Sequence, residues 1–179
     1  MVGRENEKAH LTSLLKSTEH EFVAVFGRRR VGKTYLIRES YDYNFVFQHT
    51  GVNNNSLKNE SMKEHQLDKF AESLETYGVK IEQPIKDWNE AFFYLRKVIE
   101  HSKEKKKVIF IDELSWMDTK GSGLISALES FWNGWVTARK EKDVILIVCT
   151  SATYSKHNMC SREYDWEEIE KSLISNGSW

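Results

Sequence analysis

Cysteine and proline are scarce in this sequence. Only two cysteines occur among the 179 residues, Cys149 and Cys160, and they match no metal-binding or redox spacing. Cys149 stands in the apolar run VILIVC, which favours a small buried thiol. The only proline, Pro84, is expected in a loop that precedes an amphipathic segment. We therefore expect a reduced, cytoplasmic protein.

Long hydrophobic runs are absent as well. No apolar stretch approaches the roughly 20 residues that are needed to span a bilayer. The N-terminal segment MVGRENEKAHLTSLL lacks the basic-then-apolar pattern of a signal peptide. The six histidines are scattered, and none forms a pair at metal-ligand spacing. These absences argue against a membrane protein and against a histidine metal site.

Neither sign of charge dominates. Lysine and arginine number 26, aspartate and glutamate number 27, and the formal net charge at pH 7 is −1. The net charge gives such a chain no overall electrostatic attraction to nucleic acid, but it does not exclude a local basic site. The length fits one ordinary domain, and a hydrophobic content of 40% with six tryptophans excludes wholesale disorder.

Compact apolar runs alternate with helical patterns along the chain. The predicted strands are 22–26, 44–48, 108–112 and 144–149, and the predicted helices are 6–16, 33–40, 57–77, 88–102 and 124–140. The segment HTGVNNNS (49–56) is expected to form a loop, because it is rich in turn-forming residues. Ser56 is expected to cap the third helix and Gly78 to end it, while EKKK (104–107) is expected to be solvated. Because strands alternate with helices, we predict an α/β fold with a parallel sheet covered on both faces.

The stretch FVAVFGRRRVGKTYLI contains a phosphate-binding pattern. Gly27, Gly32, Lys33 and Thr34 satisfy G-x-x-x-x-G-K-[ST], after a predicted strand and before a predicted helix. The glycines allow backbone amides to point at phosphate oxygens, and the start of the helix adds its positive end. The lysine would reach the β- and γ-phosphates and the threonine hydroxyl would ligate Mg²⁺. The alternative is a glycine-rich turn with a surface lysine.

The run VIFIDE supplies two acids at the end of a predicted buried strand. Asp112 would reach the Mg²⁺ that Thr34 holds, and Glu113 would orient and deprotonate an attacking water. Neighbouring strand residues point to opposite sides, so the two acids would have different roles. The two acids are consecutive, and a predicted strand separates them from the phosphate loop. This order favours the hydrolase branch of phosphate-loop enzymes over small-molecule kinases and GTPases, which usually lack the second acid. The alternative is an acidic turn of the kind common in α/β proteins.

The last predicted strand ends in polar residues. Thr150, Ser151 or Thr153 would contact the γ-phosphate or the attacking water, and Ser151 is our first choice. Polar residues that close a buried strand also serve as capping groups, so that reading stays open. In FWNGW (131–135), core packing is favoured over a partner-binding surface.

Four segments carry a resemblance to a known family. They are VGRENEKAHLTSLL, VAVFGRRRVGKTYLIRE, VIFIDELSWMDTKGSGLISALESFWNGW and LIVCTSAT, and they span about residues 2–153. Together they resemble the archaeal- and bacterial-type AAA-family ATPases, in the STAND-like branch of AAA+ proteins. The resemblance implies a P-loop NTPase three-layer sandwich with strand order 5-1-4-3-2 and with ATP or ADP and Mg²⁺ as ligands.

The resemblance also assigns residues to roles. Gly3 and Arg4 would lie by the adenine and ribose, Asp112 with Thr34 would hold Mg²⁺, and Ser151 would be the first sensor beside the catalytic Glu113 and Lys33. The remaining cofactor-binding positions follow the loop: Gly27, Arg28, Arg29, Arg30, Val31, Gly32, Lys33, Thr34 and Tyr35. The three arginines are equally well explained as added charge toward phosphates, as a docking patch for an acidic partner or nucleic acid, or as solvated charge.

The C-terminal segment departs from the family pattern. Thr150 stands where relatives tend to have glycine, and residues 154–179 replace the expected fifth strand and helical lid. We therefore expect an ATPase core over 1–153 and a divergent polar tail over 154–179, as in a truncated or diverged short form. Without a fifth strand, segment 22–26 becomes a sheet edge, which the tail or a second chain would cover.

These observations leave three functional hypotheses. The first is a Mg²⁺-dependent AAA+-type ATPase, with weak turnover because the lid and arginine finger are missing. The second is a nucleotide-binding switch that binds ATP or ADP without useful hydrolysis and acts through partner contacts. The third is a DNA-associated module that uses the triple arginine, which the near-neutral net charge disfavours.

Overall fold

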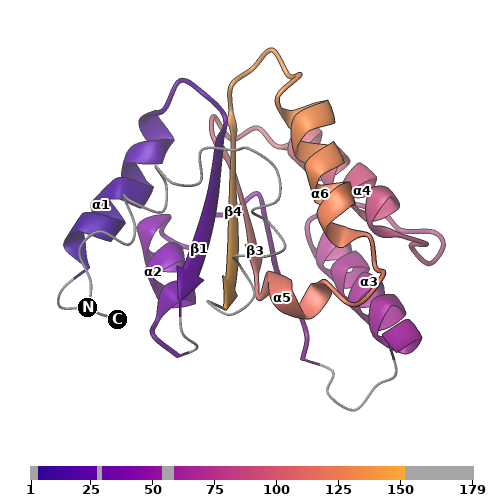
Figure 1. Ribbon diagram of the computed structural model, residues 1–179. Helices are drawn as coiled ribbons and strands as arrows, with labels where there is room; N and C mark the ends of the chain where they lie inside the picture. Colours follow the sequence, from indigo (N-terminus) through magenta and orange to yellow (C-terminus); the bar gives the residue numbers. More distant parts are fainter. Residues whose placement is uncertain (1–3, 28–29, 54–58, 152–179) are drawn as a thin grey trace.

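A four-stranded parallel sheet lies at the centre of the molecule (Figure 1). The computed structural model describes residues 4–27, 30–53 and 59–151. The strands are β1 (Glu21–Gly27), β2 (Phe47–Thr50), β3 (Lys107–Asp112) and β4 (Val144–Ser151), in the order β1-β4-β3-β2. This order confirms the predicted α/β P-loop fold for strands 1-4-3-2. The expected positions of a fifth strand and of the tail lie outside the described residues.

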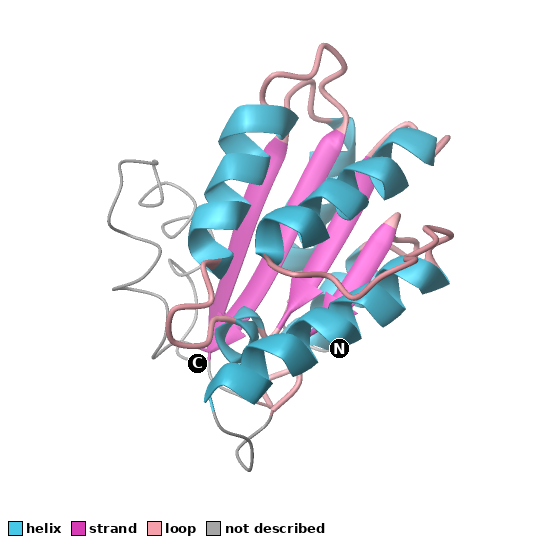
Figure 2. Ribbon diagram, turned by 90° about the vertical axis from the view of Figure 1, so that its right-hand side faces the viewer, coloured by secondary structure: helices cyan, strands magenta, loops and turns pink. Residues whose placement is uncertain are grey.

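Helices cover both faces of this sheet and make three layers (Figures 1 and 2). One face carries α1 (Glu5–Ser13), the 3₁₀ turn η1 (Leu14–Lys16) and α2 (Lys33–Ser40). The other carries α3 (Asn59–Thr76), α4 (Trp88–His101) and α6 (Leu124–Phe131), while α5 (Leu114–Met117) follows β3 directly. None of the helices in the described ranges is long and apolar enough to cross a membrane.

The alternation of side chains along the strands divides the core into two halves. On β3, Ile109 and Ile111 pack toward α3, α4 and α6, while Val108 and Phe110 pack toward α1 and α2. All six residues of β3 are buried, as expected for a central parallel strand covered on both faces. Cys149 on β4 is 1% exposed, which confirms the predicted buried thiol.

Strand β2 begins three residues later than the predicted 44–48 and ends two residues later. Asp42 and Tyr43 adopt left-handed conformations, and the Asn44 amide donates to the carbonyl of Tyr41 at 2.8 Å. A turn therefore occupies the start of the predicted strand. Pairing with β3 then continues to Thr50, which stands opposite Asp112, so the segment expected to begin a loop is still strand.

Two further predictions need correction. Lys107 was expected among solvated charges, but it is buried and its ammonium group lies 2.7 Å from the Asp143 carboxylate. The predicted helix 124–140 changes at Phe131 into a π-helical turn, η2 (Trp132–Val136). This turn contains Asn133 and Gly134, which are weak helix formers. Phe131 is fully buried and both tryptophans of the turn pack against the core while staying partly exposed, which confirms the core reading of FWNGW.

The ends of the other helices agree with local sequence signals. Asp87 caps α4, because its carboxylate accepts a hydrogen bond from the amide of Glu90 at 2.9 Å. Pro84 lies in the preceding loop, as predicted. Gly78 follows α3 with a φ of +88°, which suits a helix-ending glycine. The predicted cap of α3, Ser56, lies outside the described residues.

Candidate functional site

The phosphate-loop pattern leads from the end of β1 into helix α2. Gly32 caps this helix with a φ of +83°, a conformation that glycine adopts without steric cost, and Arg30 has a φ of +65°. The amide of Leu36 then donates to the carbonyl of Gly32 at 2.9 Å, so the helix is regular from its first turn. Arg28 and Arg29 lie outside the described residues.

Lys33, the first residue of α2, lies back over the start of the loop. Its Nζ donates to the carbonyl of Gly27 at 2.9 Å, and the residue is only 9% exposed. A Cβ atom at position 27 would lie 3.2 Å from Cδ of this lysine. Glycine at position 27 therefore leaves room for the lysine side chain. This packing requirement adds to the backbone freedom for which the motif needs glycine at this position.

Thr34 and Asp112 meet although 78 residues separate them in sequence. The threonine Oγ1 donates to Asp112 Oδ2 at 2.6 Å. The other oxygen, Oδ1, accepts from the amide of Glu113 at 2.9 Å, and the aspartate is 4% exposed. The structure thus joins the phosphate loop and the end of β3 as the sequence predicted, through a short hydrogen bond to a buried carboxylate.

Glu113 leaves the strand in an unusual conformation. Its φ of +53° is left-handed, which costs free energy for a residue with a side chain, and it forms the cap of α5. Gly51, the residue after β2, packs against its backbone, since a Cβ there would lie 2.6 Å from the Glu113 carbonyl oxygen. The amide of Gly51 also donates to the Asp112 carbonyl at 2.9 Å.

Sequence reasoning missed Gly51 and assigned it to a loop. The signal that could have found it is its place three residues after the predicted strand 44–48, which the implied strand order 5-1-4-3-2 sets beside the strand that ends in the acids. A glycine at such a strand end marks a close approach of two backbones.

The end of β4 completes the site. Cys149 is buried beside the acids, and burial first, then the Asp112 carboxylate, raise the pKa of its thiol. Thr150 is 1% exposed, and its Oγ1 has no hydrogen-bond partner among the described residues. Ser151 pairs in register with Gly27, so its backbone lies next to the start of the phosphate loop. Thr153 lies outside the described residues.

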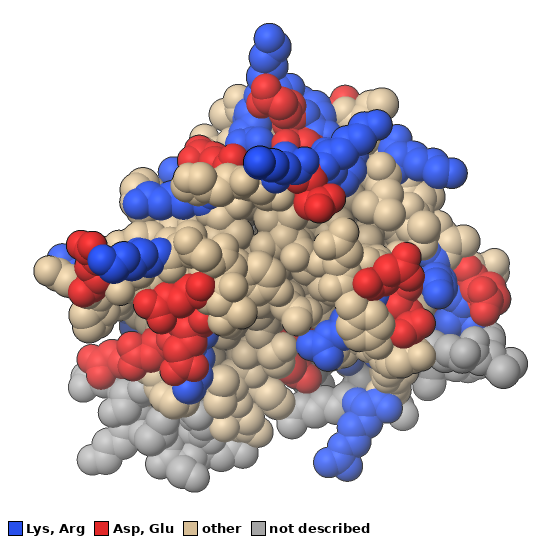
Figure 3. All heavy atoms as spheres, turned by 180° about the vertical axis from the view of Figure 1, so that it is seen from behind, with Lys and Arg blue, Asp and Glu red and all other residues tan. Residues whose placement is uncertain are grey.

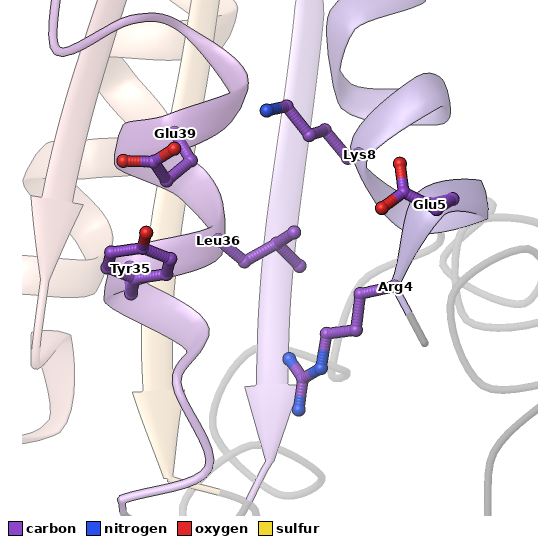
Figure 4. Close-up of a pocket in the computed structure, with 6 residues that line it drawn as sticks. All are labelled: Arg4, Glu5, Lys8, Tyr35, Leu36 and Glu39. Carbon is purple, nitrogen blue, oxygen red and sulfur yellow. The ribbon is translucent and has the colours of Figure 1, made fainter. Parts of the chain in front are cut away.

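A small charged pocket lies between α1 and α2, next to the loop (Figure 4). Arg4 lies on its wall, and its Nη2 donates to the carbonyl of Val31 at 2.7 Å. Tyr35, on the facing helix, is 49% exposed. The lining residues are Arg4, Glu5, Lys8, Tyr35, Leu36 and Glu39. The structure thus brings three predicted cofactor residues together, Arg4, Val31 and Tyr35, while Gly3 lies outside the described residues.

The oxygen atoms at the loop suit a hard cation. A hydroxyl and a buried carboxylate, 2.6 Å apart, are ligands that Mg²⁺ accepts, and this ion commonly takes one or two protein ligands with waters and phosphates as the rest. No group of three or more histidine, cysteine, aspartate or glutamate residues in the described ranges could hold a metal alone. The donor set therefore fits Mg²⁺ that arrives with a phosphate ligand.

The sequence is similar to two uncharacterised proteins. Two relatives come from Methanocaldococcus jannaschii: the uncharacterised protein MJECL04 is 28% identical over 145 residues, which are 81% of this chain and 29% of that protein. The uncharacterised protein MJ0424 is 36% identical over 75 residues, which are 42% of this chain and 64% of that protein. The chain thus spans less than a third of the length of the first relative and less than two thirds of the second.

Parts of two solved structures are also similar to this chain. The Walker-type ATPase PABY2304 of Pyrococcus abyssi is 14% identical with a TM-score of 0.47, over 84% of this chain and 45% of that one. The ORC2 protein of Aeropyrum pernix, in ADPNP and ADP complexes, is 13% identical with a TM-score of 0.47, over 97% of this chain and 46% of that one.

The family of this chain follows from its match to a protein-family model. The model described as "ATPase domain predominantly from Archaea" matches residues 1–169, almost the whole chain. Its match agrees with the sheet order and with the meeting of loop and acids at the ends of β1 and β3. The chain belongs to this family of P-loop ATPase domains.

Proposed function

We propose that this chain binds ATP or ADP together with Mg²⁺ at the carboxyl ends of its strands, and that it hydrolyses ATP. The observation that supports this most is the 2.6 Å hydrogen bond between Thr34 and Asp112, beside the buried Lys33. A hydroxyl, a carboxylate and an ammonium group from two distant segments meet at one helix N-terminus. That combination suits a metal-bound polyphosphate.

The phosphate groups would be held by the loop and by α2. Backbone amides from Gly27 to Thr34 and the positive end of the helix would face the phosphate oxygens. Lys33 would exchange its contact with the Gly27 carbonyl for the β- and γ-phosphates. Thr34 and Asp112 would hold Mg²⁺ directly or through water, and the ion would neutralise charge on the transferred phosphoryl group.

Glu113 would prepare the attacking water. Its left-handed conformation turns the chain out of β3 one residue after Asp112. A carboxylate at that point would accept the proton of a water aligned with the γ-phosphate. Ser151, or its buried neighbour Thr150, would contact that phosphate or the water from the end of β4.

The pocket between α1 and α2 would receive the base and ribose. It adjoins the loop, and the half-exposed ring of Tyr35 offers a face on which a base can stack. Arg4, together with Gly3, would lie by the ribose and adenine. In this proposal Arg28, Arg29 and Arg30 would add positive charge to the loop that binds the phosphates.

The larger organisation is also part of the proposal. Residues 1–153 would form the ATPase core, residues 154–179 a polar tail, and the motifs suggest the STAND-like branch. In the described part of the chain, β1 has a strand neighbour on one side only. Its other edge is where the tail, a second chain or another protein would pair.

One assay separates the proposed hydrolysis from binding alone. Phosphate release and Mg-ATP binding would be measured for the wild type, Glu113→Gln and the control Glu75→Gln, which changes an exposed glutamate on α3. Glu113→Gln should bind as tightly as the wild type, because the amide keeps the size of the side chain. It should release phosphate about 100-fold more slowly, the usual loss when a general base is removed.

Each other outcome has a definite meaning. Equal phosphate release by Glu113→Gln and the wild type would remove this glutamate from the mechanism. A wild type that binds Mg-ATP but releases no phosphate would replace hydrolysis by the nucleotide-switch hypothesis. The Glu75→Gln control should match the wild type in both measurements.

A further inference from the structure

Three turns meet at the end of the sheet that lies away from the phosphate loop. They are residues 17–20, 102–106 and 137–143, which lead into β1, β3 and β4. Register brings their ends together, because Lys107 pairs with Val144, and Glu21 with Ile145. Since the strands are parallel, this end is a full strand length from the carboxyl ends where the candidate nucleotide site lies.

Hydrogen bonds hold the three turns to one another. The ammonium group of Lys106 donates to the carbonyls of Glu19 at 3.2 Å and Lys142 at 2.7 Å. The amide of Val144 donates to Nδ1 of His20 at 3.2 Å. The buried pair of Lys107 and Asp143 joins the last two turns. The surface that these turns form is therefore a fixed scaffold.

Several lysine residues lie on these three turns or next to them. We call the set Lys16, Lys103, Lys105, Lys106, Lys140 and Lys142 the lysine apex. Figure 3 shows basic side chains gathered at this end of the molecule. Five of the six are exposed, and Lys106, which ties the turns together, is half-buried.

The positive charge of the apex is not neutralised locally. The three turns hold five of the six apex lysines but only three exposed glutamates, Glu19, Glu104 and Glu141. In the described part of the chain, no ion pair joins any of these glutamates to an apex lysine. The whole chain has a net charge of −1, so this excess is a local feature.

We propose that the lysine apex binds the phosphate backbone of nucleic acid without sequence preference. Exposed ammonium groups on a fixed convex surface attract a chain of phosphates as point charges and release its counterions. A membrane surface fits less well, because stable anchoring needs apolar side chains that enter the lipid. Among the exposed large hydrophobic side chains of the described residues, only Leu15 lies in an adjoining segment.

The test is fluorescence anisotropy with a labelled mixed-sequence 20-base-pair DNA duplex at several salt concentrations. The apex variant is Lys103→Gln, Lys105→Gln, Lys140→Gln and Lys142→Gln together, which leaves Lys106 to hold the turns. The control removes the same charge elsewhere, with Lys63→Gln, Lys69→Gln, Lys80→Gln and Lys86→Gln. The apex variant should bind at least tenfold more weakly, with a salt dependence shallower by about three to four released counterions.

The control variant should bind DNA as the wild type does. Lys33→Ala should also keep its DNA affinity, so this proposal can fail or succeed independently of the nucleotide site. Equal losses in the apex and control variants would overturn the proposal, and so would a wild type with no salt-sensitive DNA binding. Apex-dependent binding of phosphatidylserine vesicles or of polyglutamate that exceeds binding of DNA would overturn it too.

Discussion

At the scale of single residues, the candidate site depends on groups that are buried before any ligand arrives. Lys33 and Asp112 are 9% and 4% exposed. Each is held by a hydrogen bond, the lysine to the Gly27 carbonyl and the aspartate to the Thr34 hydroxyl. Preorganised groups of this kind lose little conformational freedom on binding. Less of the free energy of their interaction with phosphate and metal is therefore offset by lost entropy.

His49 is buried and lies outside the candidate site. Its environment predicts how the stability of the fold depends on pH. Its Nδ1 lies 2.8 Å from Ser73 Oγ, its ring meets Phe70 edge-on, and burial lowers its pKa to about 4. A histidine whose pKa is lower in the folded than in the unfolded state stabilises the fold fully above about pH 6.5. That stability is lost as the pH falls from about 6.5 toward 4.

We predict that the free energy of unfolding falls by up to about 3 kcal/mol over this pH range because of His49. Urea titrations at pH 7 and at pH 4.5 would measure the change in the wild type and in His49→Gln. The variant keeps a side-chain donor for Ser73 and cannot gain a proton, so its stability should depend less on pH. An unchanged pH dependence in the variant would refute this origin.

At the scale of elements, the junction between β2 and α5 fixes the position of the acids. Gly51 follows β2, donates to the Asp112 carbonyl and leaves no space for a side chain beside Glu113. A Cβ at this position would lie 2.6 Å from a backbone oxygen, which cannot move without shifting the helix start.

Gly51→Ala should therefore destabilise the protein by about 1–3 kcal/mol and slow phosphate release by displacing Glu113. Gly134→Ala is the matched control, since a Cβ at Gly134 would meet no atom within 4 Å and its φ is not positive. Thermal unfolding and phosphate release of both variants would test this. A Gly51→Ala protein as stable and active as Gly134→Ala would contradict the close approach.

The elements also show what sequence patterns can predict. Strands β1, β3 and β4 were predicted within one or two residues, because the apolar runs in the sequence coincide with the strand positions that the fold buries. β2 was misplaced, since the turn from Tyr41 to Asn44 uses left-handed Asp42 and Tyr43 instead of glycine. Lys107 was misjudged because its partner, Asp143, is 36 residues away and only the fold brings them together.

At the scale of the whole molecule, the two proposed sites lie at opposite ends of the sheet. The carboxyl ends of β1, β3 and β4 bring together the loop, the acids and the polar end of β4. The opposite ends carry the lysine apex (Figure 3). The composition of the chain does not indicate the lysine apex, because its net charge is −1. The local excess of lysine becomes visible only when the register of the strands brings the three turns together.

The proposed function requires that Lys33 and its loop bind a nucleotide phosphate. Isothermal titration of Mg-ATP into the wild type, Lys33→Ala and the control Lys69→Ala tests it most directly, with thermal unfolding to verify that each protein is folded. We predict one site in the wild type, unchanged affinity in Lys69→Ala and at least tenfold weaker binding in Lys33→Ala, since a charged hydrogen bond is worth about 1.5–3 kcal/mol. Folded Lys33→Ala protein that binds Mg-ATP as tightly as the wild type would contradict the account.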